Sequence, residues 1–170
     1  GSAGYVHAAC MIEMNRHRAE RRDECPTCKQ RFVGTLAMAI ASARVSDSQS
    51  SWEFDTAATS SLARAFLEQG DYGEALKLYR QVLRYAIGRF GHEHLHVADT
   101  NLNMGATYQK MCNNDKAVGC YNRALAIYEK VHGPNHLQTA KAKVNIGVVY
   151  KKMGLFEGAL GMYNEALPVF

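Results

Sequence analysis

The fold is decided by a nine-residue stretch that returns twice at a fixed interval. Residues 75–83 read ALKLYRQVL, residues 117–125 read AVGCYNRAL, and residues 159–167 read ALGMYNEAL. Each stretch begins 42 residues after the previous one. A constant period of this length is typical of repeat proteins, in which every unit packs on its neighbours.

The same offset holds outside these stretches. It superimposes the following sets of residues: Phe66, Tyr108 and Tyr150; Asn103 and Asn145; Gly91 and Gly133. Within each period, apolar residues recur at three- and four-residue steps in two stretches separated by turn residues, a pattern that indicates two helices. We therefore predict an all-α fold of stacked helical hairpins, each hairpin one unit.

Small residues mark the positions where the two helices of a hairpin should approach closely. They are Gly105, Ala117, Gly147 and Ala159. In the second hairpin, Cys112 stands where the others have a turn glycine, so we expect Asn113 or Asn114 to supply the turn geometry. We expect both Cys112 and Cys120 to be packing thiols.

The run Ala-x-x-x-Tyr-x-x-Ala-Leu resembles the tetratricopeptide repeat. The linking segments, with Gly91, His94 and Ala98 and again Gly133, His136 and Ala140, are similar to the kinesin light chain variety. The resemblance implies a right-handed superhelix made by residues 53–170, with three repeats of which the third is truncated. The recurring histidines are then turn residues and not metal ligands.

Tetratricopeptide domains are expected to grip extended peptides on the concave face that their first helices line. By this resemblance, the matching positions are Arg64, Asn103, Gln109, Lys110, Lys141, Asn145, Lys151 and Lys152. An Asn amide both donates to and accepts from a peptide backbone, and Lys and Arg favour acidic groups. We therefore predict a protein-interaction scaffold with an acidic peptide or protein partner.

The start of the chain carries a different pattern, His-x2-Cys-x14-Cys-x2-Cys. Its members are His7, Cys10, Cys25 and Cys28. Two donor pairs at this spacing are typical of a tetrahedral zinc site, and zinc is the one cofactor that the sequence predicts. The four donors either close a single site or belong to a larger finger cut in half.

Residues 1–33 also resemble the second half of a RING-type zinc finger of the RING-CH variant. That family implies ubiquitin-ligase activity, with a ubiquitin-conjugating enzyme as partner, but two upstream cysteine pairs of the finger are missing. The alternative function is thus a fragment of a RING-type ubiquitin ligase whose repeats select the substrate. Residues 34–52 are predicted to form a short helix and a linker.

The composition of the chain argues against several classes of function. The chain has 170 residues and a formal net charge of +4, too mild for a nucleic-acid partner. No apolar run approaches the roughly 20 residues of a membrane span. Five scattered cysteines favour a reducing compartment, so we predict an intracellular, cytoplasmic protein. No catalytic constellation occurs at recognisable spacing, and whether a longer parent is an enzyme stays open.

Overall fold

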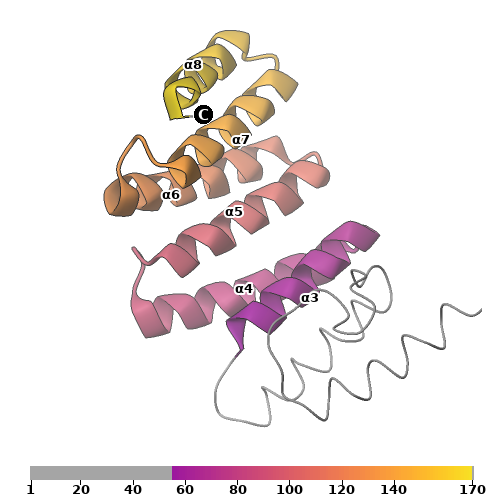
Figure 1. Cartoon of the computed structure of the whole chain (residues 1–170). Helices are drawn as coiled ribbons and strands as arrows, with labels where there is room; N and C mark the ends of the chain where they lie inside the picture. The colour runs from indigo at the N-terminus through magenta and orange to yellow at the C-terminus, as the bar shows by residue number, and fades with distance from the viewer. Residues whose placement is uncertain (1–54, 170) are drawn as a thin grey trace, which may run out of the picture.

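A computed structural model of the protein describes residues 55–169 and shows six α-helices, one 3-10 helix and no strand in that range. The helices are α3 (Thr56–Gln69), α4 (Tyr72–Phe90), α5 (Leu95–Lys110), α6 (Asn114–His132), α7 (Leu137–Lys152) and α8 (Phe156–Ala166), followed by η1 (Leu167–Val169). Each helix packs against the next one along the chain, and α3 also contacts α5 (Figure 1). The predicted all-α hairpins are confirmed, whereas the predicted segments 1–33 and 34–52 lie outside the described residues.

The turn inside each hairpin has the same backbone geometry. In all three, one residue is left-handed: Gly70 at φ 85°, Cys112 at φ 57° and Gly154 at φ 78°. The next residue's N–H then donates to the carbonyl five positions earlier, for example from Asn113 to Tyr108 at 2.9 Å. This hydrogen bond is the mark of a Schellman turn.

Two expectations about the second turn are therefore wrong. Cys112 itself adopts the left-handed conformation, while Asn113 has a negative φ and caps α6 by accepting from the Lys116 N–H at 3.3 Å. Cys112 is also exposed, so only Cys120, which is buried, is a packing thiol. The position in the turn, and not the residue type, sets the backbone here.

Cys112→Gly is expected to raise the free energy of unfolding by about 1 kcal/mol. A side chain in the left-handed region costs about 1–2 kcal/mol, and the greater freedom of glycine in the unfolded chain offsets part of the gain. Urea denaturation of the wild type, Cys112→Gly and Cys112→Ser measures it. Serine keeps the strain, so an equal gain in Cys112→Ser would contradict this explanation.

The link between hairpins is also repeated. His94 and His136 cap α5 and α7, each with Nδ1 accepting from the backbone N–H two residues later at 3.2 Å. The ring of His94 stacks on that of Phe90 with 4.5 Å between the ring centroids, and the ring of His136 stacks on that of His132 with 4.1 Å between the centroids. These histidines are turn residues, as predicted, and no group of three or more potential metal ligands gathers within residues 55–169.

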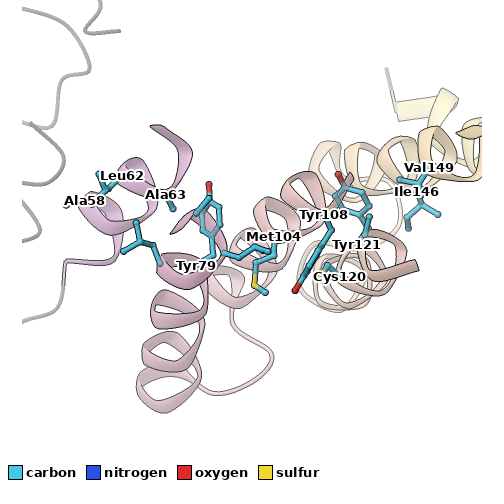
Figure 2. Close-up of a cluster of buried hydrophobic side chains, with 14 residues drawn as sticks. Ala58, Leu62, Ala63, Tyr79, Met104, Tyr108, Cys120, Tyr121, Ile146 and Val149 are labelled. Atoms are coloured by element: carbon cyan, nitrogen blue, oxygen red, sulfur yellow. The ribbon is translucent and has the colours of Figure 1, made fainter. Parts of the chain in front are cut away.

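Tyrosine rings fill the core between the two helices of a hairpin (Figure 2). A Cβ placed on Gly105 would lie 2.6 Å from the Tyr121 ring, and one on Gly147 would lie 2.6 Å from the Tyr163 ring. The small residue at this position is required, as predicted, but it makes room for an aromatic ring and not for the partner backbone. Ala117 and Ala159 are buried on the facing helices.

Among the described residues, no helix combines the length and the apolar character that crossing a bilayer requires.

Candidate functional site

The first helix of each hairpin keeps one stripe of side chains out of the core. On α5, Asp99, Asn103, Ala106 and Gln109 are half-buried, whereas the intervening positions are mostly buried. Steps of three and four residues place side chains on one face of a helix. The stripes, in full, consist of Ala57, Ser60, Ser61, Arg64 and Glu68 on α3; Asp99, Leu102, Asn103, Ala106, Gln109 and Lys110 on α5; and Lys141, Val144, Asn145, Val148, Lys151 and Lys152 on α7. We call this surface the first-helix face.

All eight residues predicted to bind a peptide lie on the first-helix face. Arg64 comes from α3, three come from α5 and four come from α7. Arg64 and the four lysines of the set are exposed, and Asn103, Gln109 and Asn145 are half-buried. The structure therefore groups the eight side chains by element and leaves them accessible from one side.

Asn103 and Asn145 are the repeat-equivalent amides of this face. Neither side chain has a hydrogen-bond partner within residues 55–169. By contrast, the amide of Asn101, on the buried side of α5, donates to the Val97 carbonyl at 2.8 Å. Asn103 and Asn145 thus keep both a donor and an acceptor for another molecule.

Gln109 differs because it already has a partner. Its Oε1 accepts from the Tyr121 hydroxyl at 2.9 Å. Burial raises the pKa of Tyr121 to about 12, so the hydroxyl stays protonated and remains a donor at neutral pH. The amide nitrogen of Gln109 is what this residue can still offer to a ligand. This contact was not predicted from the sequence, because it depends on the tyrosine ring lying over Gly105.

The lysines of the described chain fall into two groups. Those outside the first-helix face have partners: Lys77 pairs with Glu74, Lys130 pairs with Glu93, Lys143 pairs with Glu129 and Glu165, and Lys116 lies over the Tyr108 ring. The four on the face are Lys110, Lys141, Lys151 and Lys152, and none has a carboxylate or aromatic partner in the part of the chain that the structure describes. The unpaired lysines of the described residues therefore all lie on this one surface.

Lys143 is a charged residue for which no role was predicted from the sequence. Its side chain is only 8% exposed, and its Nζ lies 2.9 Å from Glu165 on α8 and 3.3 Å from Glu129 on α6. The hydrogen bond to Glu165 raises the pKa of Lys143, against the opposing effect of burial. Lys143 thereby ties α7 to both neighbouring second helices, on the side of α7 away from the first-helix face.

Asp99 is an acidic residue of the face that was also not predicted. Its Oδ1 accepts from the hydroxyl of Tyr128, which is buried on α6, at 2.5 Å. Burial and this hydrogen bond both raise the pKa of Tyr128. The equivalent position on α7 is Lys141, so the charge on the face changes sign from one unit to the next.

The structure does not describe the four predicted zinc ligands. His7, Cys10, Cys25 and Cys28 lie outside residues 55–169, and zinc binding stays a prediction.

Comparison with known proteins identifies the repeats. Two tetratricopeptide repeat models match residues 58–89 and 96–170, which together make up more than half of the chain. The chain belongs to the tetratricopeptide repeat family. Both matches begin after residue 57, so the resemblance of residues 1–33 to a zinc finger gains no support from them.

Several solved structures share the fold. BtubC (BKLC) from P. vanneervenii is 21% identical with a TM-score of 0.70, over 77% of this chain and 53% of its own. A putative kinesin light chain from Podosopora anserina with nearly identical TPR-like repeats is 20% identical with a TM-score of 0.60, over 65% of this chain and 53% of its own. NprR in complex with its cognate peptide NprX is 22% identical with a TM-score of 0.65, over 81% of this chain and 39% of its own.

These similarities support the predicted kinesin light chain-like repeats at the level of the fold. The chain spans about half the length of the first two structures. No curated protein sequence matches the chain significantly.

Proposed function

We propose that this protein is an interaction scaffold that binds an extended, acidic peptide segment along its first-helix face. The observation that carries the proposal is the pair Asn103 and Asn145. These two accessible amides stand one repeat apart and have no partner within the described residues. Tetratricopeptide repeats are generally interaction modules, and NprR, which shares the fold, was solved with a bound peptide.

The chemistry of the face fits an extended chain. Successive backbone N–H and C=O groups of an extended peptide need partners that both donate and accept, and Asn provides both regardless of the peptide's sequence. The unpaired lysines then favour acidic side chains or a terminal carboxylate. Because these charges are exposed, the attraction weakens as salt is added.

Replacing both amides is expected to weaken peptide binding about tenfold or more. Each lost hydrogen bond contributes about 1 kcal/mol, and 1.4 kcal/mol corresponds to a factor of ten. The probe is a fluorescein-labelled twelve-residue Glu-Ser peptide, followed by fluorescence anisotropy with Asn103→Ala/Asn145→Ala. The matched control is Asn122→Ala/Asn164→Ala, an exposed pair that is likewise one repeat apart but lies on the second helices.

Two results would contradict the proposal. One is equal weakening by the control pair, with the folding of both variants checked by urea denaturation. The other is equal affinity for a Lys-Ser peptide of the same length.

The second candidate function is a RING-type ubiquitin ligase, and it concerns a longer parent chain of which this sequence would be a fragment. That alternative depends on the spacing of His7, Cys10, Cys25 and Cys28. Zinc analysis of the wild-type chain and of Cys25→Ser tests the metal site, and a full finger in the parent would bring in a ubiquitin-conjugating enzyme as a partner.

A further inference from the structure

Charge is distributed unevenly over the three first helices. Among its residues, α3 carries one cation and one anion, Arg64 and Glu68, and α5 carries Asp99 and Lys110. The third first helix, α7, contains four lysines and no acidic residue. Any molecule lying along the first-helix face therefore meets a neutral stretch and then a strongly positive one.

Not all of the α7 charge is available to a ligand. Lys143 is buried between Glu129 and Glu165 on the opposite side of the helix, so its charge is compensated within the protein. The other three, Lys141, Lys151 and Lys152, are exposed and have no carboxylate partner within residues 55–169. These three define the cationic end of the face.

The dipole of α7 explains the positions of only some of these lysines. Lys151 and Lys152 lie in the last turn of α7, where cations stabilise the negative end of the helix dipole. Lys141 is the fifth residue of α7, beyond the first turn and far from the last one, so the helix dipole does not account for a cation there. Its equivalent on α5 is the acidic Asp99. A negative group from outside the protein is what would compensate Lys141.

The position on α5 that is equivalent to Lys141 carries a negative charge and so disfavours an acidic ligand group. Asp99 presents a carboxylate there, with one oxygen held by the Tyr128 hydroxyl. An acidic group of the ligand would be repelled by Asp99 on α5, whereas it would be attracted by Lys141 at the equivalent position on α7. On α3, the exposed Arg64 and Glu68 offset each other, so that end of the face carries no net charge to attract an acidic group.

We propose that the ligand is charge-polarised, with its acidic block over α7 and an uncharged segment over α5 and α3. This inference rests on the proposed function and adds the register in which the peptide binds. Asn103 then contacts the backbone of the uncharged segment, while Asn145 contacts the backbone beside the acidic block.

Photo-crosslinking tests the register. Two labelled peptides join a block of four Glu to eight residues of Ser and Gln, one in each chain order, with a benzoylphenylalanine at the acidic end or at the neutral end. For the peptide that binds more tightly, the acidic-end probe is expected to crosslink to α7 and the neutral-end probe to α3 or α5. Crosslinks from the two ends to the same helices would overturn the inference.

A charge-matched pair of variants gives the second readout. Lys141→Gln/Lys151→Gln/Lys152→Gln is expected to weaken the block peptide about tenfold or more. The control, Lys77→Gln/Arg84→Gln/Arg89→Gln on α4, removes the same net charge and is expected to change affinity less than threefold.

The outcomes separate this inference from the proposed function. Equal loss in the two triple variants overturns the register while binding through Asn103 and Asn145 stands. If neither the block peptides nor the Glu-Ser peptide binds, the proposed function and the register both fail.

Discussion

Raising the pH from about 10 to 12 is expected to unfold the protein cooperatively. Burial of the rings raises the pKa of Tyr79 and of Tyr121 from 10.0 to about 12. The unfolded chain therefore loses these protons first, and the stability they contribute is complete below pH 10 and lost as the pH rises through 12. A shift of two pKa units corresponds to about 3 kcal/mol for each tyrosine. Together the two amount to about 5–6 kcal/mol, which is the lower end of the stability of a typical domain, about 5–15 kcal/mol.

The unfolding is measured by following helix content by circular dichroism, and the ionisation of tyrosine by following tyrosinate absorbance, across the same pH range. Ionisation of the buried phenols and loss of helix should overlap, because these groups ionise at lower pH in the unfolded chain than in the folded one. Tyr121→Phe removes one of the ionisable groups and should move the unfolding midpoint to higher pH. Ionisation of all the tyrosines near pH 10 with the helices intact would contradict the account.

Removing both carboxylates that face Lys143 is expected to cost about 3 kcal/mol of unfolding free energy. Glu129→Gln/Glu165→Gln leaves a buried ammonium without a negative partner, and breaking a buried pair from one side typically costs about 3–5 kcal/mol. The lower end applies because the two glutamate side chains are 42% and 55% exposed, so water reaches the site. Urea denaturation at neutral pH measures the change.

Two controls isolate the buried charge. Glu74→Gln breaks an exposed pair with Lys77 and should cost less than about 1 kcal/mol. Lys143→Asn introduces the residue found at the equivalent position 101 and leaves the two glutamates to be solvated, so it should cost less than the double variant. A larger cost for Lys143→Asn than for Glu129→Gln/Glu165→Gln would show that the lysine stem, and not its charge, holds α7 in place.

The repeat made most of the fold predictable. Residues that recur at 42-residue intervals occupy equivalent places, so Tyr121 and Tyr163 are both held over a glycine, and His94 and His136 both cap a helix. The side of each first helix that faces outward was predictable for the same reason, since the helical period fixes it once the buried positions are known.

Features in which one unit departs from the others were not predictable in this way. Lys143 stands where the other units have Thr59 and Asn101, and its partners come from two different helices that periodicity does not bring together. Cys112 takes a glycine's conformation because the surrounding turn imposes it. The hydrogen bond between Tyr121 and Gln109 depends on how the two helices are oriented, which the sequence pattern does not specify.

The most direct test of binding on the first-helix face is an NMR titration of isotope-labelled protein with the Glu-Ser peptide, following the side-chain amide signals of asparagine. The largest shifts are expected at Asn103 and Asn145, whereas the signals of Asn122 and Asn164 on the second helices should not move. Shifts confined to the second helices, or no shift at peptide concentrations that saturate the anisotropy signal, would contradict it.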